Sequence, residues 1–179
     1  MDKDDGLILA CAQDRAAFQA LIERHQARIY GFLIRLAGRD AADDLFQEVW
    51  MKVHANAHRY EARGKAASWL FKIANNLAMN HLARAGRRAT VDVEEFAAVL
   101  AEPSPGPHAV LERKEAQRRL ESMISGLPAE QRQVFLMREY GELSFKDISE
   151  TLEIPLGTAL SRMNYALGKL REALGDHDA

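Results

Sequence analysis

The apolar residues of this chain recur at intervals of three and four positions almost throughout, which is the spacing of an α-helix. The pattern is clearest from Leu7 to Leu36, where apolar residues follow one side of the expected helix until Gly38 ends the run. Strong alternation with a period of two, typical of half-buried strands, is absent from the sequence. The spacing therefore predicts an all-α protein in which each helix buries one face.

The helical spacing breaks between Ala101 and Pro107, where the sequence AEPSPGP holds three of the five prolines. Such a segment can neither continue a helix nor build a core. A chain of 179 residues has room for one domain or for two small ones. The break favours two small helical domains, residues 1–88 and 111–179, joined by a flexible, acidic and proline-rich linker at 89–110.

Charge is segregated along the chain, although the formal net charge is only −2. Residues 59–88 carry seven basic side chains against one acid, which suggests a local contact with nucleic acid. Cys11 is the only cysteine, so an internal disulfide and a thiolate metal cluster are excluded. The first residues are charged, and no apolar run reaches the length of about 20 needed to cross a bilayer. We therefore expect a cytoplasmic protein without membrane insertion.

A polar stripe runs along the helix expected from Trp69 to Arg88. Lys72, Asn76, Asn80 and Arg84 recur at every fourth position and share one side of that helix. Asparagine is a mediocre helix former, so its repeated use here calls for a reason. Amide side chains can pair with the edges of bases, and cations can contact phosphates. The alternative interpretation is a solvated helix face with a basic tail.

The helix expected from Asp40 to Tyr60 has an acidic side. Asp40, Asp43, Asp44 and Gln47 share this side, and Glu48 lies at its edge. Acids in the first turn of a helix stabilise its dipole, which accounts for Asp40 and Asp43 better than for the later residues. An acidic face next to a basic helix favours two different partners, a basic protein and a nucleic acid.

The second half of the chain predicts a helix-turn-helix. Ser144 to Asp147 form a capping-box pattern that begins a short helix, and the connection Glu153 to Pro155 leads to a last helix from Leu156 to about Leu174. In this arrangement the second helix enters the major groove. Its outward residues are Thr158, Ser161, Arg162, Asn164, Tyr165 and Lys169.

Only Arg162 and Lys169 are basic among these outward residues, so we expect a modest affinity for DNA through this helix. Leu160 and Leu167 fall at the edge of its apolar side. They either widen the core or form a hydrophobic contact with another protein.

Three blocks of the sequence together resemble the extracytoplasmic-function (ECF) group of bacterial sigma factors. They are DAADDLFQEVWMKV, SWLFKIANNLAMNHLARAGRR and LPAEQRQVFLMREYGELSFKDISETLEIPLGTALSR, with the proline-rich segment before the third. The resemblance spans nearly the whole chain in the order of the family. It implies an initiation factor that binds core RNA polymerase and promoter DNA, is controlled by an anti-sigma factor and has no catalysis of its own. No cofactor, no metal and no homo-oligomer are expected.

The resemblance also assigns roles to individual residues. The acidic helix would dock on the polymerase through Asp43, Asp44, Leu45, Gln47 and Glu48. The next loop and helix would open the minus-ten promoter element and hold a flipped base. The matching positions are Arg63, Lys65, Ser68, Trp69, Lys72, Asn76, Asn80, Arg84, Arg87 and Arg88. The six outward residues of the last helix would read the minus-thirty-five element.

The chain departs from the family pattern at two places. The family often carries Lys-Ser-Arg followed by further arginines in the recognition helix, whereas this chain has Leu160-Ser161-Arg162. Asn75 stands where arginine is common, which removes one expected phosphate contact. The preference for the upstream promoter element is therefore open.

Two other functions compete with this interpretation. A helix-turn-helix regulator that does not join the polymerase would explain residues 127–174 but would leave the acidic face without a purpose. A helical metal hydrolase would use Asp43, Asp44, Glu48, His54 and His58. The sequence offers no second helix with matching ligands for such a metal.

Overall fold

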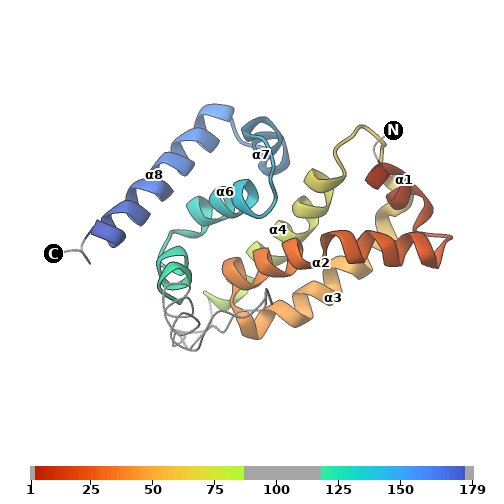
Figure 1. Cartoon of the computed structure of the whole chain (residues 1–179), viewed down its shortest axis with the longest axis horizontal. Helices are drawn as coiled ribbons and strands as arrows, with labels where there is room; N and C mark the ends of the chain where they lie inside the picture. The colour runs from red at the N-terminus through yellow and green to blue at the C-terminus, as the bar shows by residue number, and fades with distance from the viewer. Residues whose placement is uncertain (1–2, 87–117, 176–179) are drawn as a thin grey trace, which may run out of the picture.

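The structure is a computed structural model that describes residues 3–86 and 118–175 (Figure 1). Within these ranges the regular elements are all helical, which confirms the all-α prediction. The predicted linker lies outside the described residues, and residues 118–125, which follow the second undescribed segment, are helical. The elements are α1 (Lys3–Ala10), α2 (Arg15–Ala37), α3 (Arg39–Asn56), the 3-10 helix η1 (Ala57–Arg59), α4 (Ala66–Ala85), α6 (Ala129–Glu139), α7 (Phe145–Leu152) and α8 (Leu156–Gly175).

Helices α2, α3 and α4 pack around one apolar core. Phe32 of α2 and Phe71 of α4 are fully buried, and their rings meet edge to face with centroids 5.2 Å apart. Leu33, Val49 and Leu70 are buried around them. Burying one such side chain stabilises the fold by about 1.5–3 kcal/mol, and around this shared core α3 and α4 pack against each other as well as against α2 (Figure 1).

The helix boundaries in this half follow local chemistry. Asp14 caps α2 by accepting a hydrogen bond from Ala16 N at 2.8 Å, and Gly38, with φ +92°, ends α2 as predicted. Ser68, whose residue type is a favourable helix cap, does not cap α4, because α4 begins at Ala66 and Ser68 lies in its first turn. Gly64, two residues before α4, has φ +69°, a left-handed conformation that glycine adopts without steric cost.

The second half forms the predicted helix-turn-helix. Ser144 caps α7 by accepting a hydrogen bond from Asp147 N at 3.0 Å, which confirms the capping prediction. Glu153 adopts a left-handed conformation that ends α7, and a short connection leads to α8. Ala159, Met163, Ala166 and Leu170 turn the inner side of α8 toward α6 and α7. Pro128 precedes α6 rather than forming its first residue.

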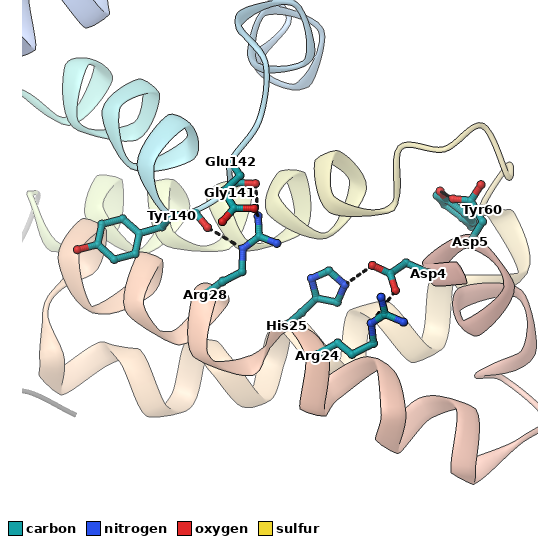
Figure 2. Close-up of polar contacts among 9 residues, drawn as sticks. All are labelled: Asp4, Asp5, Arg24, His25, Arg28, Tyr60, Tyr140, Gly141 and Glu142. Carbon is teal, nitrogen blue, oxygen red and sulfur yellow. Dashed lines mark hydrogen bonds and ion pairs between the residues drawn. The ribbon is translucent and has the colours of Figure 1, made fainter. Parts of the chain in front are cut away.

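The two halves pack against each other, with α6 on α2 and α7 on α4 (Figure 1). The guanidinium of Arg28 donates to the carbonyl oxygen of Tyr140 at 2.9 Å and to that of Gly141 (Figure 2). Arg35 pairs with Glu121 at 3.1 Å, and both side chains are largely buried. Arg132 of α6 donates to the carbonyl oxygen of Leu36 at 3.2 Å. The described residues of the two halves therefore pack into one unit, which we call the closed arrangement.

Candidate polymerase and promoter interfaces

The acidic side of α3 is exposed. Asp43, Asp44, Gln47 and Glu48 all lie at the surface, so one helix presents three carboxylates and an amide. The hydroxyl of Tyr30 donates to Asp43 Oδ1 at 2.6 Å, and this hydrogen bond raises the pKa of Tyr30. A surface of this charge attracts a basic protein surface and orients it during encounter.

Leu45 corrects one expectation about this face. Its side chain is 6% exposed and belongs to the core, because it lies on the side of α3 that packs against the rest of the domain. Its exposed fraction leaves little surface for a direct contact with a partner. Leu45 instead packs in the core and so helps to hold α3, with its acidic residues, in place.

The histidine near the end of α3 and the one in η1 are surface residues. His54 and His58 are exposed, and the ring of His54 meets Phe18 edge to face, with centroids 5.3 Å apart. Within the described ranges, no group of three or more His, Cys, Asp or Glu side chains is placed to hold a metal ion.

The polar stripe of α4 is brought together at the surface as predicted. Asn76, Asn80 and Arg84 are exposed, whereas Trp69 and Lys72 are half-buried near the start of the stripe. The opposite side of α4 is buried, which fixes the direction in which the stripe points. A rigid row of amides and cations is suited to a nucleic-acid strand, since amides pair with bases and cations with phosphates.

The remaining residues proposed for the minus-ten element differ in their surroundings. Ser68 is half-buried, and Arg63 is exposed and forms an ion pair with Glu61. Arg87 and Arg88 lie outside the described residues. Asn75 is 5% exposed, so in this position it is not available to a phosphate.

The loop that precedes α4 is held by a residue that the sequence did not single out. Asp5 of α1 accepts hydrogen bonds from the hydroxyl of Tyr60 and, at 2.8 Å, from Gly64 N. The ring of Tyr60 also contacts Trp69, with centroids 5.1 Å apart. Asp5 stands in a charged N-terminal stretch whose sequence carries no signal of burial, so only the fold reveals this contact.

Two lysines of the proposed minus-ten surface are paired with carboxylates of the helix-turn-helix. Lys65 Nζ lies 3.4 Å from Asp147 Oδ1 and also contacts Glu150, and Lys72 Nζ lies 2.7 Å from Glu153 Oε1. The hydrogen bond to Glu150 raises the pKa of Lys65, and the one from Lys72 lowers the pKa of Glu153. In this arrangement a phosphate must displace these carboxylates before it reaches either lysine.

The outward side of α8 is polar but weakly basic. Ser161, Asn164, Tyr165 and Lys169 are exposed, and Thr158 is half-buried. Arg162 pairs with Glu130 of α6 at 2.6 Å, so one of its two predicted cations is already engaged.

The two leucines predicted at the apolar edge of α8 differ in exposure. Leu160 is 41% exposed, whereas Leu167 is half-buried and packs against the core. Leu156, one turn before Leu160, is also exposed. The edge therefore contributes to the core at Leu167 and offers apolar surface at Leu156 and Leu160.

The sequence matches two family models. Residues 21–88 match the model of Sigma-70 region 2, and residues 117–170 match that of Sigma-70, region 4. The acidic and polar faces lie in the first match, and α8 lies mostly in the second.

Curated relatives match along nearly the whole chain. The chain is 31% identical to the RNA polymerase sigma-H factor of Pseudomonas aeruginosa, covering 90% of this chain and 88% of that protein. It is 30% identical to the ECF RNA polymerase sigma factor SigK of Mycobacterium tuberculosis, covering 97% of this chain and 94% of that protein.

Solved structures share the fold. CnrH in complex with the cytosolic domain of CnrY superposes with a TM-score of 0.71 at 20% identity, covering 99% of this chain and all of that one. RpoE of Bartonella quintana in complex with the anti-sigma factor NepR gives 0.72 at 23% identity, covering 88% and 96%. The helices in the described ranges are too short or too polar to cross a bilayer. With both sigma-70 models and full-length relatives matched, the chain belongs to the ECF group of RNA polymerase sigma factors, which direct transcription initiation at specific promoters.

Proposed function

We propose that the chain divides its sigma activity between two neighbouring faces of its first domain. Asp43, Asp44, Gln47 and Glu48 on α3 bind a basic surface of core RNA polymerase, with Leu45 beneath them. The stripe of α4 opens the minus-ten element and holds a flipped base. The observation that carries this proposal is the exposure of an acidic face on α3 and of an amide-rich, basic face on the adjacent α4.

The minus-ten site in this proposal comprises the loop before α4 and one side of that helix. Trp69 supplies an aromatic surface for a base, the amides of Asn76 and Asn80 read base edges, and the cations contact phosphates. Unstacking a base costs a few kcal/mol, which contacts in a fitted pocket can offset. The full set is Arg63, Lys65, Ser68, Trp69, Lys72, Asn76, Asn80, Arg84, Arg87 and Arg88.

The helix-turn-helix would read the minus-thirty-five element through α8. Its candidate contacts are Thr158, Ser161, Arg162, Asn164, Tyr165 and Lys169. We place the functional domains at residues 1–88 and 111–179, with a linker at 89–110. The limits of the two matched family models, 21–88 and 117–170, support these boundaries.

We further propose that the protein works in the cytoplasm, without catalysis of its own, under an anti-sigma factor. The similar CnrH and RpoE structures are complexes with CnrY and with the anti-sigma factor NepR, which supports this kind of control. The exposed apolar side chains of Leu156 and Leu160 offer such a partner a contact on α8.

Reconstituted transcription tests the proposal. The purified chain is added to core RNA polymerase without an inhibitor, and run-off transcripts are mapped on promoters found by start-site mapping after overexpression. Specific initiation that requires the chain is the expected result. Failure to bind core polymerase would contradict the proposal. It would favour the alternative function, a regulator that binds DNA through its helix-turn-helix without joining the polymerase.

A further inference from the structure

The carboxylate of Asp5 is almost completely buried, with the residue 1% exposed. Buried carboxylates are rare in proteins unless they are paired, because desolvation of the charge is costly. Asp5 lies in α1, before the matched Sigma-70 region 2, which begins at residue 21. Its burial therefore calls for an explanation from its surroundings.

Both oxygens of this carboxylate are engaged by the chain segment that leads into α4. Oδ1 accepts from the hydroxyl of Tyr60, which lies against Asp5 in Figure 2, and Oδ2 accepts from Gly64 N at 2.8 Å. The loop between η1 and α4 comprises residues 60–65, with Tyr60 as its first residue and Gly64 near its other end. One side chain thus fixes both ends of this loop, including the left-handed turn at Gly64.

The same contact reaches the aromatic residue at the start of the α4 stripe. Tyr60 is buried, and its ring lies against that of Trp69, with centroids 5.1 Å apart and planes inclined by 55°. The hydrogen bond to Asp5 sets the position of the Tyr60 ring, and the Tyr60 ring limits the positions open to Trp69.

The neighbouring Asp4 has a different task. It pairs with Arg24 at 3.0 Å and with His25 at 2.9 Å, both on α2 (Figure 2). These pairs hold α1 on α2. Asp5 instead accepts from two uncharged donors of the loop, so it fixes the geometry of the loop rather than neutralising a cation.

We propose that Asp5 is a positioning residue for minus-ten recognition. Its carboxylate holds the loop at 61–64 and Tyr60 in place, so that the loop and Trp69 form a preorganised pocket for the flipped base. Preorganisation matters here because a base that has left its stack is bound more tightly by groups that need no further ordering. This inference rests on the proposed function of the loop and of Trp69.

The test compares Asp5→Asn with Asp4→Asn, both in the full chain bound to core polymerase. Three quantities are measured: the melting temperature of the free chain, the affinity for core polymerase, and the affinity of the holoenzyme for a single-stranded minus-ten oligonucleotide. The oligonucleotide carries 2-aminopurine at each base in turn, so that its fluorescence reports which base is unstacked.

We expect Asp5→Asn to weaken oligonucleotide binding by about tenfold, the effect of losing one hydrogen bond to a charged acceptor, and to reduce the 2-aminopurine signal. Polymerase affinity should match that of Asp4→Asn. Tyr60→Phe, which keeps the ring and removes only the hydroxyl, should reproduce part of the loss. The two changes combined should lose less than the product of their separate effects, because they act on one contact.

Equal oligonucleotide binding by Asp5→Asn and Asp4→Asn, with Tyr60→Phe unchanged, would overturn the inference. If Asp5→Asn fails to fold, Tyr60→Phe alone decides between the same outcomes. The variant Trp69→Ala distinguishes a failure of the role proposed for Asp5 from a failure of the proposed minus-ten site. Loss of binding by Trp69→Ala with no loss by the Asp5 and Tyr60 variants refutes only the role of Asp5, whereas no loss by any of them refutes the minus-ten site itself.

Discussion

Lys72 of α4 lies 2.7 Å from Glu153 at the end of α7, although the two residues are 81 positions apart in the sequence. Lys65 makes a similar contact with Asp147 and Glu150. Carboxylates of the helix-turn-helix thus occupy positions that phosphates would take on the proposed minus-ten surface. If the proposed minus-ten surface is correct, the contacts between the two halves in the closed arrangement compete with a promoter strand for the same two lysines.

Glu153→Lys should therefore increase the affinity of the chain for a single-stranded minus-ten oligonucleotide. The variant replaces an attraction to Lys72 by repulsion, and we expect an effect of about two- to fivefold at low salt, because solvent and salt screen exposed pairs of this kind. Fluorescence anisotropy at two salt concentrations measures it. The control is Glu172→Lys, which makes the same charge change at an exposed position of α8. An equal gain in both variants would mean that only net charge matters.

Asp44→Arg should weaken binding to core polymerase by about tenfold or more, since it places a cation against the basic surface proposed as the partner. Competition with the labelled wild-type chain for core enzyme measures the effect. Glu23→Arg, an exposed change of equal charge on α2, is the matched control. Equal competition by the Asp44 variant and the wild type would contradict docking through α3.

Asn80→Ala should impair promoter opening while leaving polymerase binding unchanged, because the exposed amide is proposed to read a base. Alanine is the better helix former, so stability should rise by about 0.5 kcal/mol rather than fall. Permanganate footprinting of the open complex and denaturant unfolding give the two readouts, with exposed Gln26→Ala as the control. A normal yield of open complex would remove Asn80 from the site.

Leu160→Lys should tighten binding to duplex minus-thirty-five DNA. Each added phosphate contact steepens the dependence of log affinity on log salt by about 0.9, so the slope is the decisive quantity. Leu160 is partly exposed, and its replacement should change stability little. Leu174→Lys, also exposed near the end of α8, is the control. An unchanged slope for Leu160→Lys would show that this edge faces a protein.

Ser144→Ala should lower the stability of the chain by about 1 kcal/mol at neutral pH, because it removes the cap of α7. The Ser144 hydroxyl also holds the pKa of Asp147 below its usual value. A carboxyl whose pKa is lowered by folding stabilises the protein when ionised, and this contribution is lost as the pH falls below about 4. Denaturant unfolding at pH 7 and pH 3.5 should therefore show a smaller difference between variant and wild type in acid.

Sequence patterns predicted the features that depend on neighbouring residues. Helical spacing gave the elements, and the run from Ser144 to Asp147 located the start of α7, because a cap is formed within one turn. The polar side of α4 also followed from spacing alone. The start of α4 at Ala66 did not, and the loop just before it is hydrogen-bonded to α1, a contact between distant segments that no local pattern marks.

Contacts between distant segments could not be predicted in this way. The burial of Asp5 and the pairing of Lys65 and Lys72 with α7 each join residues more than 50 positions apart, and no local pattern marks them. A family resemblance likewise does not predict which residues of a motif are buried, as Leu45 shows. That residue matched a docking motif, but the packing of α3 places its side chain in the core.

The guanidinium of Arg28 holds the two halves together through the carbonyl oxygens of Tyr140 and Gly141. Carbonyl groups belong to the main chain and do not titrate, so these two hydrogen bonds do not depend on pH, whereas the ion pair of Arg28 with the exposed Glu142, at 3.4 Å, does. Separation of the halves returns the cation of Arg28 to solvent. A partner that separates the halves must therefore offer acceptors of its own to Arg28, and it must also replace the ion pairs that Arg35, Lys65 and Lys72 form with the second half.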